Sequence, residues 1–531
     1  MKLSTYPKFR RLLTAGTAAL AVGVVSLNAN IGTLNAEAAA PQIPLRAAAE
    51  NLLSKVTWNA SSDSVTVEGE GLSGTFTLGS TSAALNGKAM TLDAAPYAQN
   101  GRVYVSEMGL TALRDASAVA QNRTGFELVS SFDVPSGKAE IASSTPDGQR
   151  LIVTEADAGS IAVLDIADPM QPSLLKNVSF KSLSDKAEVT SVAAMPDGNY
   201  ALAVIRTGDT MQLANPGLLA VVDLRTYEIA KTYPLGIGPD SIAVSKDGRY
   251  AVIAIEDEEL DPATDEYDYP NAKRPGSISV IEFTDGDALS GTLTDLPVDL
   301  SGTEGAIYPH EPQPEYVAIN EAGTTAAVTL QENNAIALVD LATKKVTKIF
   351  ALGTTTHAAD VEEDGLVSFT TMMQGRFEPD GIVFSPDGKH LITANEGDLG
   401  KNEFEDSVRA GGRNIAVWDL DGNLVYDSLN LIDEAAARAG VYPDDRSPNK
   451  GSEVENLAVS TIDGQPILAV AAERADAILF FDLTDAAKPT YLGLIRTAGE
   501  SPEGIHRVSG RDLFISADEG TGTISFYAKS K

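Results

Sequence analysis

Short apolar runs, either alternating with polar residues or β-branched throughout, recur along the chain from about residue 124 onward. Such patterns predict β-strands rather than helices. One unit repeats: a strand that opens near an acidic residue, a tight turn ending in glycine, a second strand and a strongly apolar third strand. The third strands align at seven places, namely 161–166, 219–224, 278–283, 336–341, 415–420, 478–483 and 524–529.

Seven copies of one such unit predict an all-β fold, a seven-bladed β-propeller of four-stranded blades over residues 124–531. The last copy ends at its third strand, and a spare strand, Phe126–Val134, precedes the first copy. We predict that this strand completes the seventh blade and closes the ring, which leaves no unpaired strand edge. The alternative is two separate domains of three and four repeats.

The segment before the propeller, residues 40–123, is predicted to be a small β-rich module and a linker. Polar and apolar residues alternate in short runs such as Ser64–Val67, and Asn86-Gly87 and Asn100-Gly101 are hairpin turn signals.

The first 39 residues have the pattern of a signal peptide. Basic residues at positions 2, 8, 10 and 11 precede the apolar run Leu12–Leu27, and Ala36-Glu37-Ala38 is a cleavage site. An uncleaved anchor is the alternative interpretation. No second apolar run is long enough to cross a membrane, so we expect no transmembrane segment after cleavage and a secreted protein.

Composition excludes some partners and some kinds of metal site. The formal net charge is −34, which argues against nucleic acid as a partner because phosphate binding needs a basic surface. The chain has no cysteine, which excludes disulfides and thiolate metal sites. It has four histidines.

The predicted topology gathers acidic residues at one end of the propeller, the upper face, where the first strands begin. First strands line the central channel, so their opening residues are expected to ring its mouth: Glu140, Glu188, Asp240, Glu315, Asp380, Glu455 and Glu503. A second set follows about 16 residues later, between second and third strands, and these acids are candidate metal ligands: Glu256, Glu332, Glu396, Glu473 and Glu519. Glu155 has the corresponding place in the first blade, and Arg206, a candidate ligand-binding residue, occupies it in the second blade.

The long insertions are predicted on the same face, at 257–276, 302–313, 354–377, 397–413 and 428–452. Loops of this length on a rigid scaffold usually carry function, so we expect the ligand site here. His310, in one of these loops, and His506, three residues after Glu503, are candidate ligand-binding residues.

Crowded carboxylates must raise their pKa values, recruit basic side chains or bind a cation. Oxygen ligands favour Ca²⁺ or Mg²⁺ as the cofactor. The competing interpretation is purely structural, with the acids paired to Arg206, Arg409, Arg413 or Arg474. No haem, flavin or nucleotide is expected. The motifs of serine hydrolases, zinc proteases and P-loop proteins are absent from the sequence.

Three stretches resemble the choice-of-anchor I family of secreted bacterial propellers, which is similar to YVTN-type and lactonase-like propellers. They are PEYVAINEAGTTAAVTLQENNAIALVD (314–340), EPDGIVFSPDGKHLITANEGD (378–398) and the region from Val454 to Pro489. The resemblance spans most of residues 130–530 and implies an exported or surface-held protein.

The stretch LNGKAMTLDAAPYAQNGRVYV (85–105) resembles the copper amine oxidase N-terminal-like stalk module of Gram-positive surface proteins. It departs from that pattern at Ser106-Glu107-Met108, so we expect a weak closing helix and a partial module. The label does not imply amine oxidation, and no copper site is expected because the required histidine cluster is missing from the sequence. The resemblance implies a spacer or adhesion element and a cell-wall-associated, Gram-positive-like location.

Two functions remain open. The first is a secreted or cell-surface binding or scaffold propeller, with a Ca²⁺-dependent site at the acidic channel mouth and an extracellular ligand or cell-wall component as partner. The second is a metal-dependent hydrolase of the phosphoesterase or lactonase type that uses the same carboxylates.

Overall fold

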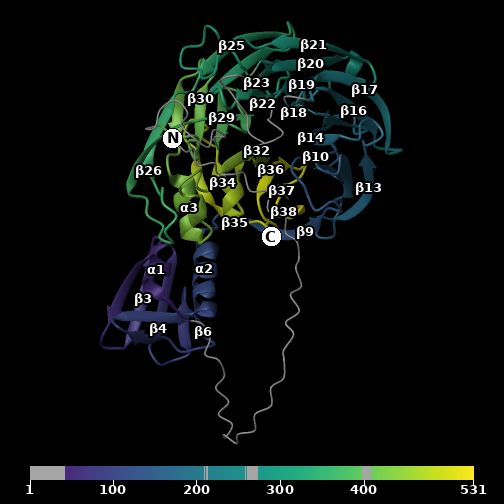
Figure 1. Ribbon diagram of the computed structural model, residues 1–531. Coiled ribbons are helices and arrows are strands. Elements are labelled where there is room, and N and C mark those ends of the chain that lie inside the picture. Colours follow the sequence, from purple (N-terminus) through teal and green to yellow (C-terminus); the bar gives the residue numbers. More distant parts are fainter. Residues whose placement is uncertain are drawn as a thin grey trace, which may run out of the picture.

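Seven antiparallel sheets of four strands form a ring (Figure 1) in the computed structural model, which describes residues 42–208, 210, 213–257, 259, 273–396 and 408–530. Blade 1 consists of β10 (Ala142–Ser144), β11 (Arg150–Glu155), β12 (Ser160–Asp165) and β13 (Ser173–Ser179), and blade 2 of β14 (Glu188–Ala194), β15 (Tyr200–Arg206), β16 (Pro216–Asp223) and β17 (Glu228–Ile237). Blade 3 consists of β18 (Pro239–Val244), β19 (Tyr250–Ile255), β20 (Ser277–Phe283) and β21 (Gly291–Pro297), and blade 4 of β22 (Pro314–Ile319), β23 (Thr325–Leu330), β24 (Ala335–Asp340) and β25 (Lys345–Ala351). The fifth and sixth are β28 (Ile382–Phe384), β29 (His390–Asn395), β30 (Asn414–Asp419), β31 (Leu424–Asp427); and β32 (Val454–Ile462), β33 (Gln465–Ala472), β34 (Ala477–Asp482), β35 (Thr490–Arg496).

The seventh blade joins the two ends of the propeller. Its first three strands are β36 (Pro502–Arg507), β37 (Leu513–Asp518) and β38 (Thr523–Lys529). Its fourth is β9 (Phe126–Asp133), which pairs antiparallel with β38 from Thr523↔Asp133 to Lys529↔Phe126. The first strand of the first blade, β10, contacts both β14 and β36. The predicted closing strand and the single seven-bladed ring are therefore confirmed, and the two-domain alternative is wrong.

The hydrophobic core is divided among the blade interfaces. Seven buried apolar clusters each join two neighbouring blades, and an eighth fills the N-terminal module. The second and third strands of each blade face a neighbouring blade on both sides, which explains why β19 is buried at every residue. This packing holds the first strands, and the acids at their upper ends, in fixed positions.

Residues 42–121, the N-terminal module, form two small sheets and two helices. The larger sheet has the order β2 (Lys55–Asn59), β3 (Ser64–Gly69), β4 (Leu72–Thr77), β5 (Ser82–Leu85), β6 (Lys88–Thr91). The smaller sheet has the order β1 (Gln42–Pro44), β8 (Arg102–Ser106), β7 (Tyr97–Gln99). The helices are α1 (Leu45–Glu50) and α2 (Glu107–Gln121).

The expectation of a weak closing helix is wrong, because α2 has 15 residues. Ser106, which departs from the stalk-module pattern, supplies the N-cap: its hydroxyl accepts from the backbone N–H of Gly109 at 3.4 Å. Glu107 in the first turn suits the helix dipole, and Leu110 and Leu113 are buried in the module core.

The long insertions differ in the elements that they form. Residues 354–377 contain the hairpin β26 (Thr354–Ala359) and β27 (Thr371–Arg376). Residues 428–452 contain α3 (Leu431–Ala439), which contacts the outer strand β35 of blade 6 and α2 of the module (Figure 1). The apolar residues of α3 pack on the cluster shared by blades 5 and 6. The carbonyl of Ala439, at the end of α3, accepts from Arg496, which pairs with Ala477 at the upper end of blade 6.

Other predictions fall outside the described residues. These are the signal peptide (1–39) and most of the insertions at 257–276 and 397–413. Within the described residues, no helix is long and apolar enough to cross a membrane.

Candidate functional site

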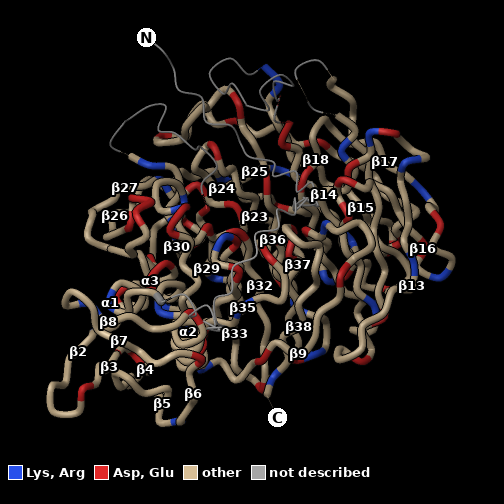
Figure 2. Tube along the Cα trace, turned by 60° about the horizontal axis from the view of Figure 1, so that its bottom comes forward, with Lys and Arg blue, Asp and Glu red and all other residues tan. Residues whose placement is uncertain are grey.

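Strand pairing brings the two predicted sets of acids to one end of the propeller. The first residue of a first strand lies opposite the last residue of the second strand, as in Pro314↔Leu330, Val454↔Ala472 and Pro502↔Asp518. The acids of the first set are next to those starts, and the acids of the second set follow those ends by one or two residues. Figure 2 shows Asp and Glu positions gathered near the centre of the ring, around β23, β24 and β36. We call this group of carboxylates the acidic mouth.

A register shift accompanies the acid in five first strands. It lies between Val189 and Ser191, Pro239 and Ile242, Pro314 and Val317, Val454 and Leu457, and Pro502 and Gly504. A bulge of this kind bends the strand and redirects a side chain. Consistent with this, acids of different blades lie close enough to shift one another's pKa values.

These pKa values rise because the carboxyl groups are buried and close to like charges. Burial, together with Glu519 and Glu188, raises the pKa of Glu140 to about 8. Burial, together with Asp380 and Glu332, raises the pKa of Glu315 well above its ordinary value. The carboxyl groups of Asp380, Glu455 and Glu503 behave in the same way, and the pKa of Asp380 rises to about 8.

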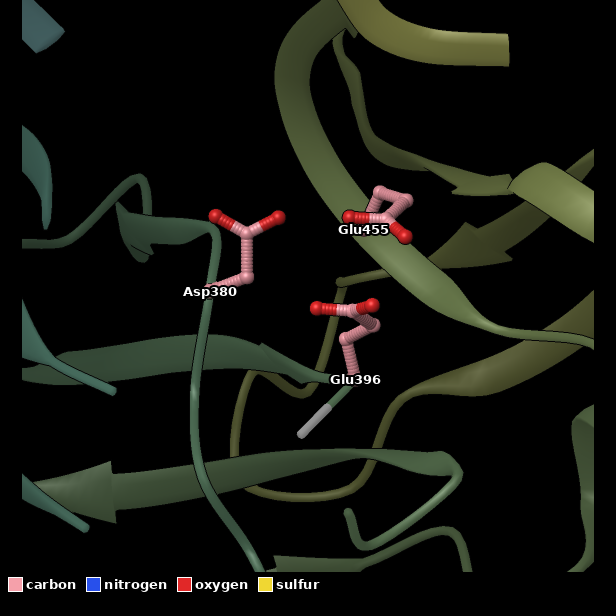
Figure 3. A group of neighbouring side chains, drawn as sticks. All are labelled: Asp380, Glu396 and Glu455. Atoms are coloured by element: carbon pink, nitrogen blue, oxygen red, sulfur yellow. The ribbon is translucent and has the colours of Figure 1, made fainter. Parts of the chain in front are cut away.

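Three groups of carboxylates have the spacing of metal ligands. Within each group the ligand oxygens lie within 4.8 Å of one another: Asp380, Glu396 and Glu455 (Figure 3); Glu453, Glu455 and Glu473; and Glu473, Glu503 and Glu519. Ca²⁺ holds its oxygens at about 2.3–2.6 Å, so two oxygens on one ion lie at most about 5 Å apart. Because Glu455 and Glu473 are each shared by two groups, the three groups form a continuous band over blades 5, 6 and 7.

Basic side chains neutralise the three carboxylate groups to different extents. Arg446 and Arg474 donate to Glu453 at 2.7 and 3.0 Å, and Lys450 lies 3.7 Å from it. Although burial acts to raise the pKa of Glu453, Lys450, Arg474 and Arg446 outweigh it and lower that pKa to about 2. The group containing Glu453 is thus already neutralised and is the poorest of the three for a cation.

The other two groups also have basic neighbours. Lys450 also pairs with Glu396, which in addition accepts from the Gln331 amide at 2.8 Å, and Lys138 pairs with Glu519. Glu473 lies 2.6 Å from Arg474, yet burial and the neighbouring Glu453 raise its pKa to about 7. Asp380, Glu455 and Glu503 belong to these groups and have raised pKa values.

On the side of the mouth formed by blades 2 and 3, Arg206 lies among the acids. Its guanidinium lies 3.3 Å from Glu256 and 3.6 Å from Asp240, and its Cα is paired with that of Glu188. Arg206 therefore joins the acids of blades 2 and 3, as the structural alternative predicts, while blades 5 to 7 contain the groups with ligand spacing.

The two candidate histidines differ from the acids. His310 is exposed and makes an edge-to-face contact with Tyr308, with ring centroids 6.4 Å apart. His506 lies in β36, where Nε2 accepts from the backbone N–H of Ser144 at 3.0 Å and lies 2.9 Å from the Ser144 hydroxyl. Burial lowers the pKa of His506 to about 4. Its hydrogen bonds with Ser144 join blades 7 and 1.

Sequence reasoning missed three residues of the mouth: Glu453, Lys450 and Arg446. All three come from the end of the 428–452 insertion or just beyond it, where no repeat marks their place. Of the four arginines expected to pair with the acids, Arg206 and Arg474 do so. Arg413 instead donates to the carbonyls of Asp360, Ser447 and Asn449, and Arg409 donates to that of Pro448.

Comparison with known proteins places this arrangement in a family. The sequence model of the choice-of-anchor I domain matches residues 140–410 and 398–486. The chain belongs to the choice-of-anchor I family. Membership indicates a secreted or cell-surface protein and, with the propeller fold, a surface binding or scaffold role. The copper amine oxidase N-terminal domain matches residues 37–110 of this choice-of-anchor I protein.

No curated protein matches the chain. Among solved structures, the choice-of-anchor I protein is similar to Kuenenia stuttgartiensis hydrazine synthase, with 13% identity and a TM-score of 0.49 over 74% of this chain and 96% of that one. It is also similar to the Cps50 (Swd1) β-propeller domain of Myceliophteria thermophila, with 9% identity and a TM-score of 0.47 over 76% of this chain and 99% of that one. Similarity this distant says nothing about ligands.

Proposed function

We propose that this choice-of-anchor I protein is a secreted or cell-surface binding propeller that holds Ca²⁺ in the acidic mouth and binds an extracellular or cell-wall ligand through it. The observation that carries the proposal is the band of three carboxylate groups whose oxygens lie within 4.8 Å of one another. An all-oxygen donor set of this kind suits Ca²⁺ better than zinc or copper.

The group formed by Asp380, Glu396 and Glu455 is the preferred site. Buried like charges at this distance destabilise one another, and a divalent cation would remove that repulsion. Lys450 beside Glu396 supplies one positive charge, which a cation would supplement or displace. Glu315, whose pKa is raised partly by Asp380, lies near enough to add charge on the blade 4 side.

Equilibrium dialysis of the purified mature protein against Ca²⁺, followed by elemental analysis, tests this proposal. We expect saturable Ca²⁺ binding that is lost in the double variant Asp380→Asn/Glu455→Gln. The matched control is Glu321→Gln/Asp421→Asn, which removes two exposed carboxylates from turns outside the mouth. Absence of Ca²⁺ from the wild-type protein, or equal binding by both double variants, would contradict the proposal.

The same experiment has a pH signature. The cation binds the ionised carboxylates, whereas Asp380, with a pKa of about 8, is protonated at pH 6. Binding therefore releases protons, and the affinity is expected to rise from pH 6 to pH 8 by up to about tenfold per pH unit for each proton displaced.

A metal-dependent hydrolase is the second candidate, favoured by one observation. Glu473, with a pKa of about 7 beside the Glu503 and Glu519 carboxylates, has the pKa of a general base that works near neutral pH. Ca²⁺- or Mg²⁺-dependent turnover of phosphoester or lactone substrates, lost in Glu473→Gln, would establish this activity. Metal binding without turnover would support the binding propeller.

A further inference from the structure

A second concave site lies in the N-terminal module, away from the propeller. It is a pocket of about 570 Å³ between α1, strand β2 and the hairpin of β7 and β8. Leu45, Val56, Val65 and Val103 supply apolar walls. Pockets of this size that combine apolar walls with a few polar groups are typical of small-ligand sites.

One wall of the pocket is Trp58, which is 47% exposed. Trp58 lies directly opposite Val65 in the antiparallel pair of β2 and β3, so both side chains are on the same face of the sheet. Val65 is buried in the module core, and Trp58 extends this apolar face to solvent because β2 is the edge strand. The indole is thus a flat aromatic surface that the module core does not use.

The polar groups of the pocket are two arginines and one acid. Arg46 and Glu50 pair at 3.3 Å on α1, and both are exposed. Arg102 also lines the pocket, and within the described part of the chain it has no carboxylate within 4 Å. The pocket therefore carries a net positive charge in a protein whose formal net charge is −34, which favours an anionic ligand.

We propose that this pocket binds a saccharide that carries a carboxylate. A sugar ring has an apolar C–H face that can pack on the Trp58 indole, the amphipathic side chain used at such contacts. Its hydroxyl groups both donate and accept, which matches the Arg46 and Glu50 pair. The planar guanidinium of Arg102 can bind the carboxylate with two parallel hydrogen bonds.

An extended peptide is the competing ligand, because β2 and β7 are both edge strands and could accept an added strand. Their edges are poor templates, however. β7 has three residues, and β2 has five and carries Lys55, a residue type that blunts strand edges. The saccharide uses side chains that the pocket already presents.

Tryptophan fluorescence gives a direct test in the mature full-length protein. The chain has two tryptophans, and Trp418 is 2% exposed in the propeller core, so quenching by acrylamide reports mainly Trp58. The probes are trigalacturonate, its methyl ester, which lacks the charge, and the peptide Val-Thr-Val-Thr-Val. EDTA is present throughout, so that binding does not depend on a metal in the acidic mouth.

We expect trigalacturonate to protect Trp58 from acrylamide and the methyl ester to bind about tenfold more weakly, the effect of one charge-assisted contact. Arg102→Gln should remove that difference between acid and ester, and Trp58→Ala should abolish trigalacturonate binding measured by calorimetry. The control Lys88→Gln, which removes an exposed cation from the β5–β6 hairpin, should bind as wild type.

Several results would overturn the proposal. They are equal affinity of the wild-type protein for trigalacturonate and its methyl ester, wild-type affinity of Arg102→Gln for trigalacturonate, protection of Trp58 by the peptide but not by the sugars, and no binding of either sugar. If Trp58→Ala fails to fold, the Arg102→Gln comparison still decides, because Arg102 is an exposed side chain outside the module core.

Discussion

Two glutamates of the acidic mouth, Glu453 and Glu455, are two residues apart in the chain, yet their surroundings push their pKa values in opposite directions. Both are buried, which favours the neutral acid. Lys450, Arg474 and Arg446 overcome burial at Glu453 and lower its pKa to about 2. Glu455 faces Glu396 and Glu473 in addition to being buried, and its pKa rises well above its ordinary value. The neighbours, rather than the residue type, decide which acid is available for a cation.

His506 gives a prediction about pH and stability. Its pKa is about 4 in the folded protein and about 6.5 in an unfolded chain, so the unfolded state binds more protons between these values. Stability should be fully present above pH 6.5 and should fall as the pH drops toward 4, by up to about 3 kcal/mol in total. At pH 5 we expect a loss of about 2 kcal/mol, because protonation of Nε2 breaks its bond with the Ser144 N–H.

Urea unfolding at pH 7 and pH 5 measures this effect. His506→Gln keeps an acceptor oxygen but does not titrate, so it should lose less stability than the wild type between the two pH values. His310→Gln, which changes an exposed loop histidine, should lose as much as the wild type. An equal loss in His506→Gln and wild type would show that His506 does not carry this pH dependence.

Residue-scale features were predictable only where a repeat marks them. The acids at the strand starts recur in all seven blades, so their gathering at one face followed from topology. Lys450 and Arg446 lie in an insertion without periodicity, and their approach to Glu396 and Glu453 depends on how that insertion folds. The sequence therefore indicated where carboxylates meet but not which of them are neutralised.

At the scale of elements, β9 is the strand on which ring closure depends. It comes from the N-terminal side of the propeller and completes a sheet whose other strands are the last three of the chain. Phe126 anchors it: the ring is 3% exposed, stacks on Phe480 with centroids 5.2 Å apart and meets Phe514 edge-on at 5.6 Å.

We expect Phe126→Ala to destabilise the propeller by about 3–5 kcal/mol, the usual cost of truncating a buried aromatic residue. Leu128→Ala, on the same strand but 37% exposed, should cost less than about 1.5 kcal/mol. Urea unfolding followed by fluorescence of the buried Trp418 measures both variants. Similar midpoints for the two variants would mean that β9 does not depend on this contact.

Element prediction succeeded for the blade strands and failed for helix α2 and for the elements β26, β27 and α3 inside the insertions, for physical reasons. Strands with apolar residues on both faces have an unmistakable pattern, and the spare strand Phe126–Val134 could be assigned because one blade lacked a fourth strand. Helix α2 was underestimated because Ser106-Glu107-Met108 was compared with a family pattern. Those residues supply an N-cap and a favourable first-turn charge, which are sufficient to start a helix.

At the scale of the whole molecule, the module and the propeller share an interface that the sequence does not mark. Helix α2 contacts α3 and β35, and the Ser117 hydroxyl donates to the carbonyl of Arg438. Asp115 pairs with Arg496 at 3.1 Å, and the Asn51 amide donates to the carbonyl of Gly365 at 2.9 Å. The interface uses a few short-range contacts from non-repeating segments, so neither periodicity nor composition indicates it.

A charge placed in this interface should separate the two parts. Ala118 of α2 is partly buried and packs against the cluster formed by α3 and blades 5 and 6, whereas Leu113 of the same helix faces the module core. Ala118→Glu would bury a carboxylate against apolar residues, which costs several kcal/mol, so we expect the module to undock while both parts stay folded. Small-angle X-ray scattering should show a larger radius of gyration, and proteases should cut faster between residues 122 and 125. The control Val119→Glu adds the same charge at a neighbouring position that is 74% exposed and should scatter as the wild type. An unchanged radius of gyration in Ala118→Glu, with unchanged circular dichroism, would mean that contacts other than α2 hold the module in place.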